Sequence, residues 1–200
     1  MRILVAGATG VIGRRLVPLL ISAGHEVAGI TRSDDGASNI AHLGAEGIVC
    51  DVFDAKSLIS CVSNFKPDVV WNQLSDLPDD RYLLAEFGPA NNRIRREGTV
   101  NLLNAANAAG AGQFISQSVA WQLVGDGGRA VLDLERAVRA AGGVIVRYGQ
   151  LYGPGTYYQT ELPEHPRIHV DEAAKRSLPA LEMENGVLTV IDEMGPDDPD

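Results

Sequence analysis

The sequence predicts an α/β protein with a doubly wound parallel sheet and helices on both faces. Short apolar runs alternate with longer segments whose apolar residues recur at helical spacing. This alternation is typical of βαβ units, and it predicts about seven strands here. A glycine-rich turn also joins the first apolar run to the first helical segment. The chain has 200 residues, which is enough for one domain of this kind and too few for two of average size.

The glycine-rich turn spans residues 7–13 and reads GATGVIG, between a strand at 2–6 and a helix at 14–23. In a Rossmann-type fold, the first glycine allows the tight turn, the second admits a pyrophosphate and the third lets helix and strand pack closely. The free N–H groups at the helix N-terminus then face the phosphates. An ordinary glycine-rich turn is the alternative. We expect the following residues to bind a dinucleotide: Gly7, Thr9, Gly10, Val11, Ile12 and Gly13.

The second strand is expected at 25–31, followed by Arg32 and Ser33. In dinucleotide folds the residue at this place meets the adenosine ribose, where a carboxylate suits a 2′-hydroxyl and a cation suits a 2′-phosphate. Because a guanidinium holds a phosphate with two hydrogen bonds, Arg32 with Ser33 favours NADP(H) over NAD(H) as the cofactor. A surface arginine without a ligand is the alternative. Arg14 and Arg15 are candidates for a second phosphate contact.

The next elements are expected to be a loop at 34–39, a strand at 45–50, a helix at 55–64 and a strand at 69–74. Asp51 and Val52 follow the third strand, where Asp51 is placed to accept a hydrogen bond from adenine. A helix cap is the alternative for Asp51. Gln73 and Leu74 end the fourth strand and are included among the expected cofactor contacts.

A loop is expected at 77–88, followed by a long helix from Pro89 to about 109. Small residues at 101–109 let another backbone approach closely, either in a homodimer or in a helix buried against the sheet. The arginines near the start of this helix are expected on a solvated face, with an anion site as the alternative. They are Arg93, Arg95 and Arg96.

The fifth strand is expected at 113–118, and Ser118 lies at its end, where a doubly wound fold places chemistry beside the nicotinamide. The remaining expected elements are a glycine-containing loop before 129, a helix at 129–141, a strand at 144–148, a loop at 156–166, a helix at 171–182 and a strand at 186–191. We expect one NAD(P)-binding domain over residues 1–194 and an acidic tail at 195–200.

The net charge of −9 comes largely from the last 20 residues, which contain seven carboxylates and no lysine or arginine. Without them, 19 acidic and 17 basic residues leave a charge of −2. This near-neutral body argues against nucleic acid and anionic membranes as partners. Cys50 and Cys61 lack the spacing of a metal or redox pair, and no signal peptide is evident, so we expect a cytoplasmic protein without a metal.

Several ordered motifs resemble the short-chain dehydrogenase/reductase superfamily, on its branch of NAD(P)-dependent epimerases, dehydratases and atypical reductases. The resemblance covers nearly the whole chain. It rests on GATGVIG at 7–13, PDVVWN at 67–72, EGTVNLL at 97–103, RYGQLYGPG at 147–155 and IHVDEAA at 168–174. These motifs are specific for the family and not for a substrate.

The chain departs from the family's pattern in two places. Family enzymes carry a Tyr-x-x-x-Lys pair at the start of the helix after the fifth strand, yet residues 122–141 contain neither Tyr nor Lys. The segment between 155 and 168 is also too short for the usual substrate-binding lobe, which we expect to be reduced or absent. Ser118 is the remaining match to a catalytic residue, and Tyr152 is a weaker candidate as a substitute proton donor.

The resemblance implies an NADP(H)-binding atypical reductase or epimerase/dehydratase acting on a small carbonyl or sugar-type substrate. The alternative is a dinucleotide-binding protein without turnover, such as a redox sensor or a degenerate enzyme that acts through protein contacts. The intact phosphate loop is compatible with both interpretations.

Overall fold

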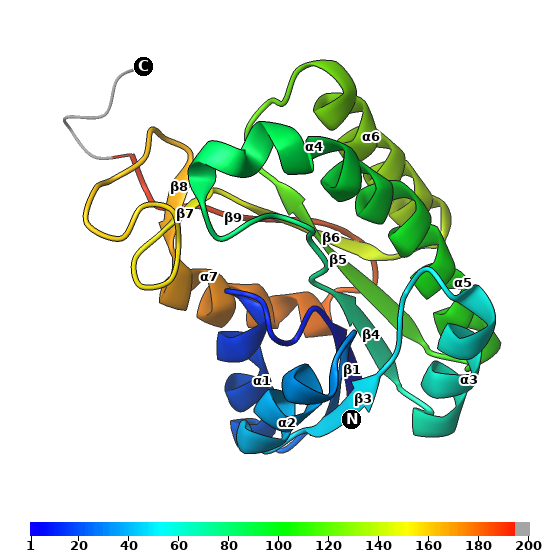
Figure 1. Ribbon diagram of the computed structural model, residues 1–200. Coiled ribbons are helices and arrows are strands. Elements are labelled where there is room, and N and C mark those ends of the chain that lie inside the picture. The colour runs from blue at the N-terminus through cyan, green and yellow to red at the C-terminus, as the bar shows by residue number, and fades with distance from the viewer. Residues whose placement is uncertain (195–200) are drawn as a thin grey trace.

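The computed structural model describes residues 1–194, and the expected acidic tail at 195–200 lies outside them. Its centre is a seven-stranded sheet in the order β3-β2-β1-β4-β5-β6-β9 (Figure 1). The strands are β1 Arg2–Ala6, β2 Glu26–Thr31, β3 Glu46–Val49, β4 Val69–Asn72, β5 Gln113–Val119, β6 Val144–Tyr148 and β9 Gly186–Val190. Every neighbouring pair is parallel. The sheet winds outward from β1 in both directions, which confirms the predicted fold class.

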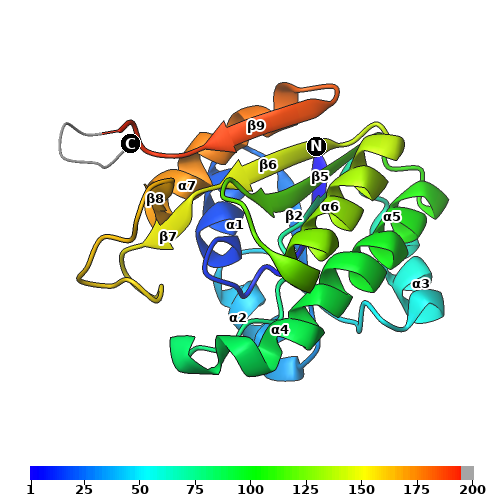
Figure 2. The same cartoon turned by 90° about the horizontal axis from the view of Figure 1, so that it is seen from above.

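Helices cover both faces of the sheet, as Figures 1 and 2 show. One face carries α1 Gly13–Ser22, α2 Asp34–His42 and α7 Val170–Ser177, and the other carries α3 Ala55–Phe65, α5 Thr99–Ala108 and α6 Gly125–Ala140. Side chains alternate between the faces along each strand. In β1, Ile3 therefore packs with α1, and Leu4 packs with α3 and α5.

The expected loop at 34–39 is wrong, because α2 occupies these residues. Ser33 caps this helix by accepting a hydrogen bond from the Gly36 N–H at 3.1 Å. Asp34 and Asp35 then lie in the first turn, where a helix dipole favours carboxylates. Only Gly36 and Ile40 of α2 are buried. Such a short buried stripe leaves no helical periodicity to read in the sequence.

The long helix differs from its predicted form in two ways. It begins as α4 Leu84–Arg93, preceded by the 3₁₀ turn η1 Arg81–Leu83, so Pro89 lies inside a helix that was expected to start there. A π-helical segment, η2 Ile94–Gly98, then joins α4 to α5. The glycine-containing loop expected before residue 129 is likewise the first part of α6.

Part of the small-residue stretch at 101–109 is buried inside the chain, whereas Asn104, Asn107 and Ala108 are exposed. Leu102, Ala105 and Ala106 pack with side chains of α3 in the core on that face of the sheet. This packing accounts for the buried residues of the stretch by the buried-helix alternative, and the homodimer stays a prediction.

A small second sheet lies beyond the end of β6 (Figure 2). It pairs β7 Gln150–Tyr152 with β8 Arg167–His169 in parallel, and the turn and loop at 153–166 connect them. The chain then enters α7 and the 3₁₀ segment η3 Leu178–Glu182 before β9. Within residues 1–194, no helix is long and apolar enough to cross a bilayer. No group of three or more His, Cys, Asp or Glu side chains in this part of the chain is placed to hold a metal ion.

Candidate functional site

The glycine turn between β1 and α1 has a backbone that side chains would disrupt at two positions. Gly7 has a φ of +87°, and a Cβ there would lie 2.5 Å from the carbonyl oxygen of Gln73. A Cβ on Gly13 would lie 2.2 Å from the carbonyl oxygen of Gly7. Both positions therefore require glycine for the close packing of loop, helix and β4.

Gly10 is different, because the protein itself leaves room around it. A Cβ on Gly10 would meet only the carbonyl oxygen of Gly7, at 3.2 Å, and its φ is not positive. Thr9 and Gly10 are exposed at the tip of the turn. Ile12 precedes α1 without capping it through its side chain, and the first turn of α1 contains no acidic residue. The N-terminus of α1 is therefore open to an anionic ligand.

Arg14 and Arg15 line a surface pocket beside this turn together with Pro154 and Gly155. Arg15 is held by the protein, because its Nε donates to Asp171 Oδ1 at 2.5 Å and its Nη2 donates to the Pro154 carbonyl at 2.7 Å. The Arg15 hydrogen bond also keeps the pKa of Asp171 below its ordinary value. Arg14 has no ion pair within residues 1–194, so it is the more available cation of the two.

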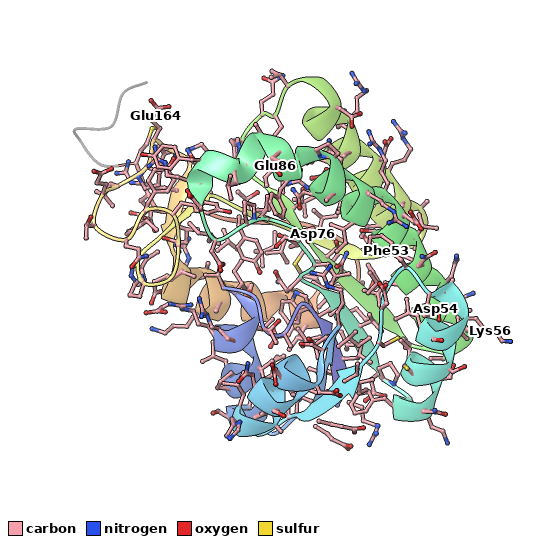
Figure 3. The ribbon with its side chains drawn as sticks, in the orientation of Figure 1. Phe53, Asp54, Lys56, Asp76, Glu86 and Glu164 are labelled. Atoms are coloured by element: carbon pink, nitrogen blue, oxygen red, sulfur yellow. The ribbon has the colours of Figure 1, made fainter. Side chains whose placement is uncertain are left out.

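Arg32 lies at the end of β2 and faces the loop after β4. Its Nη2 is 3.5 Å from Asp76 Oδ1, and its side chain is 65% exposed. Figure 3 shows Asp76 near the centre of the view, on the loop after β4. An exposed ion pair of this kind contributes roughly 1 kcal/mol or less, so a phosphate could displace Asp76 at small cost. Ser33 caps α2 next to Arg32.

Asp51 and Val52 lie in the loop between β3 and α3. Figure 3 labels the next two residues of this loop, Phe53 and Asp54. Asp51 Oδ1 accepts from the Phe53 N–H at 2.9 Å, in a turn within its own loop. The helix cap considered for Asp51 is Asp54 instead, whose Oδ1 accepts from the Ser57 N–H at 3.1 Å. Val52 is buried.

Gln73 and Leu74 tie the ends of β4, β5 and β6 together. Gln73 is buried, and its Nε2 donates to the Tyr148 hydroxyl oxygen at 3.0 Å. The Leu74 carbonyl accepts from Gln117 Nε2 at 2.5 Å. Complete burial raises the pKa of Tyr148 to about 12, so its phenol stays protonated. These bonds connect the strand ends beneath the expected nicotinamide position.

Ser118 is buried and donates its hydroxyl hydrogen to Glu135 Oε1 at 2.8 Å. Glu135, on α6, also accepts from Arg147 Nε at 2.7 Å and Nη2 at 2.5 Å. Burial raises the pKa of Glu135, but the hydrogen bonds from Arg147 and Ser118 outweigh burial and leave the pKa below its ordinary value. In this arrangement a carboxylate, and not a substrate carbonyl, takes the Ser118 hydrogen. Glu135, a carboxylate on the buried side of α6, was the one signal in the sequence that could have indicated the Ser118–Glu135 hydrogen bond.

Tyr152, on β7, is held by His169 at the end of β8 and by Asp192 just after β9. Its hydroxyl donates to Asp192 Oδ2 at 2.9 Å, and its ring packs edge-on against His169 with centroids 5.3 Å apart. Burial and the neighbouring Asp192 both raise the pKa of Tyr152. A proton donor that must ionise readily near neutral pH needs the opposite shift.

Comparison with known proteins identifies the family. The profile of the NAD dependent epimerase/dehydratase family matches residues 3–131. The chain is also 35% identical, over 236 aligned positions, to a 3-diazoavenalumate denitrifying reductase of a Streptomyces species. This alignment covers 96% of this chain and 76% of the relative. The chain therefore belongs to the NAD-dependent epimerase/dehydratase family, which confirms the resemblance seen in the sequence motifs.

Solved structures share the fold at low sequence identity. The UDP-Glc/GlcNAc 4-epimerase of Campylobacter jejuni superposes with a TM-score of 0.78 at 17% identity, over 95% of this chain and 78% of that one. The UDP-glucose 4-epimerase of Thermus thermophilus, solved in complex with NAD, gives a TM-score of 0.76 at 18% identity, over 96% and 78%. Both superpositions include the sheet, so they support the same Rossmann-type architecture.

Proposed function

We propose that this chain binds a nicotinamide dinucleotide across the carboxyl ends of its strands and acts as an atypical reductase or epimerase/dehydratase on a small carbonyl or sugar-type substrate. The fit of the residue 7–13 turn carries this proposal. Gly7 and Gly13 are held by internal packing, whereas Gly10 is open to a ligand at an uncapped helix N-terminus. A relative named as a reductase and a neighbour solved with NAD support the same class.

The preferred cofactor in this proposal is NADP(H). Arg32 lies at the end of β2, and its weak, exposed pair with Asp76 is easily exchanged for a 2′-phosphate. Arg14 contributes a second available cation near the turn. Asp51, Val52, Gln73 and Leu74 are the proposed contacts along the rest of the nucleotide. The buried Cys50 and the free Cys61 fit a reducing compartment such as the cytoplasm.

The nicotinamide, when bound, supplies or accepts the hydride. The chain's own residues position it, because the Gln73–Tyr148 and Gln117–Leu74 hydrogen bonds fix the strand ends below it. Ser118 is the proposed donor to a substrate oxygen, and it must release Glu135 to act in this way.

A second candidate function is dinucleotide binding without turnover. The Ser118–Glu135–Arg147 cluster favours it, because this cluster satisfies the proposed catalytic hydroxyl internally. The absence of Tyr and Lys from residues 122–141 points the same way.

Cofactor binding and turnover are tested separately on the purified chain. Titration with NADPH and NADH, followed by nicotinamide fluorescence, is expected to show binding of both and tighter binding of NADPH. The NADPH complex is then mixed with aldehydes, ketones, quinones and nucleotide sugars while its nicotinamide absorbance is followed. Oxidation that Ser118→Ala abolishes supports the enzyme. Cofactor binding without oxidation by any member of the panel, and without epimerisation or dehydration of the nucleotide sugars in a product analysis with NAD(P)⁺, supports the binding protein.

A further inference from the structure

Arg95 stands apart from the other arginines of the segment between α4 and α5. Arg93 pairs with Glu97 at 2.7 Å, and Arg96 pairs with Asp126 at 2.9 Å and Asp133 at 2.7 Å. Arg95 is half-buried and makes no hydrogen bond or ion pair with any residue from 1 to 194. None of its nitrogen atoms is sealed from solvent. Burial lowers the pKa of Arg95, and an arginine nevertheless stays charged in proteins.

The contacts of residues on either side of Arg95 show which way the helix face that carries Arg95 is turned. On one side, Asn92 Nδ2 donates to Asp126 of α6 at 2.9 Å, and Arg96 binds the same carboxylate. On the other side, a Cβ on Gly98 would lie 3.5 Å from Val52 Cγ2. Arg95 lies on the stripe between these two sides, since residues about four apart share a helix face.

The two neighbours of Arg95 on this stripe contact β4 and the loop after it. Asn91 Oδ1 accepts from the Asp76 N–H at 3.1 Å, and Thr99 Oγ1 accepts from Asn72 Nδ2 at 3.2 Å. Arg95 lies between them in sequence, so it is placed toward the carboxyl end of β4 and the loop that follows it. This is the edge on which the nicotinamide is proposed to lie.

Two carboxylates near this part of the edge have cationic partners in the described structure. Asp76 pairs with Arg32, and Glu135 pairs with Arg147 and Arg139. Partial burial weakens the hydration of the Arg95 guanidinium, and an anionic ligand would offset this loss. The cofactor phosphates are assigned to the residue 7–13 turn and to Arg32, and the nicotinamide itself carries no anion. Two anions are then candidates for Arg95: Asp76, once a 2′-phosphate has displaced it from Arg32, and an anionic group of the substrate. The substrate can reach Arg95, because the guanidinium nitrogen atoms are open to solvent.

We propose that Arg95 binds the carboxylate of an anionic substrate beside the nicotinamide, which makes carboxylic acids the substrate class. This inference rests on the proposed function for the place of the cofactor. The planar guanidinium matches a carboxylate with two parallel hydrogen bonds. Arg95 thus selects the substrate and is not assigned a role in proton transfer.

Calorimetric titration of benzoate and cinnamate tests the proposal, with benzamide and cinnamamide as uncharged counterparts. The protein is saturated with NADPH, and a parallel titration omits the nucleotide. Arg95→Gln is expected to weaken carboxylate binding about tenfold or more and to leave amide binding and NADPH affinity within about twofold. The carboxylate affinity of Arg95→Lys is expected to lie between those of the wild type and Arg95→Gln. Arg136→Gln, which removes an exposed arginine of α6, is the control and should change none of these values.

Three outcomes would overturn the proposal. One is that wild-type protein binds neither carboxylate, and another is that Arg95→Gln weakens NADPH binding while carboxylate binding is unchanged. The third is that phenyl phosphate, titrated in the same way, depends on Arg95 and the carboxylates do not. If NADPH fails to bind but benzoate binds in an Arg95-dependent manner, the proposed cofactor site fails and the Arg95 site stands. Thermal unfolding of each variant confirms that it is folded.

Discussion

Two regions at the carboxyl edge of the sheet differ in how their polar groups are satisfied. One is the residue 7–13 turn, called the open end below, and the other is the cluster of Ser118, Glu135 and Arg147 between β5, α6 and β6, called the satisfied end. Around Gly10, backbone groups at the start of α1 remain open to a ligand. Around Ser118, the polar side chains bind one another, with Glu135 at the centre. The comparison shows that backbone groups at one end of the edge are left open to a ligand, whereas the polar side chains at the other end are satisfied within the protein.

Gly10→Val would test the open end most strongly. The added side chain fills the space of the pyrophosphate but meets only the Gly7 carbonyl inside the protein. We expect NADPH and NADH affinity to fall about a hundredfold or more, close to 3 kcal/mol, with the fold retained. Nicotinamide fluorescence and thermal unfolding measure the two effects. Gly88→Val is the control, because a Cβ there meets nothing within 4 Å. Wild-type affinity in Gly10→Val would place the phosphates elsewhere.

Glu135→Leu would test the satisfied end. It leaves Arg147 without its partner, and we expect the free energy of unfolding in urea to fall by about 2 kcal/mol, since Arg147 is partly exposed. The double variant Glu135→Leu with Arg147→Met should recover most of this loss. An unchanged stability in Glu135→Leu would show that the cluster is not formed in solution.

The Ser118–Glu135–Arg147 cluster also predicts how the free energy of unfolding changes with pH. The pKa of Glu135 is depressed in the folded protein below its ordinary value of 4.5. Its contribution to stability is therefore present above pH 4.5 and is lost as the pH falls through the folded pKa. Urea unfolding at several pH values should show the difference between wild type and Glu135→Leu shrinking in acid. A difference that grows in acid would contradict the assignment.

Arg32→Ala would sharpen the comparison within the open end. Loss of the charged contact to a 2′-phosphate should weaken NADPH binding about tenfold and change NADH binding by less than about twofold. Paired titrations of the two nucleotides measure this selectivity. Arg129→Ala removes another exposed arginine and serves as the control. An equal effect on both nucleotides would show that Arg32 does not bind the 2′-phosphate.

Tyr152→Phe is expected to have the smallest effect. It removes the hydrogen bond to Asp192, which should lower the free energy of unfolding by about 1 kcal/mol. Nicotinamide oxidation, with whichever substrate the panel identifies, should be unchanged. A rate that falls much further than stability would restore Tyr152 as the proton donor.

Much of the fold could be predicted because its signals are local. Each strand of the large sheet is an apolar run bounded by turn residues, and the 7–13 turn carries its glycines in sequence order. α2 could not be predicted in this way, because it buries too few side chains to show a helical period. The π-helical segment and the helical start at Leu84 also lie in a stretch where proline and polar residues favour a loop.

The sequence by itself determined the class of fold, the position of the glycine turn and the family, because backbone requirements and apolar periodicity depend on a few neighbouring residues. Only the tertiary structure decided which polar groups are left free. Ser118 and Arg147 meet Glu135 across two strands and a helix, and Arg95 is distinguished from Arg93 and Arg96 by what lies opposite each of them. Pairing between distant side chains has no period and no fixed spacing, so it becomes visible when the chain is folded.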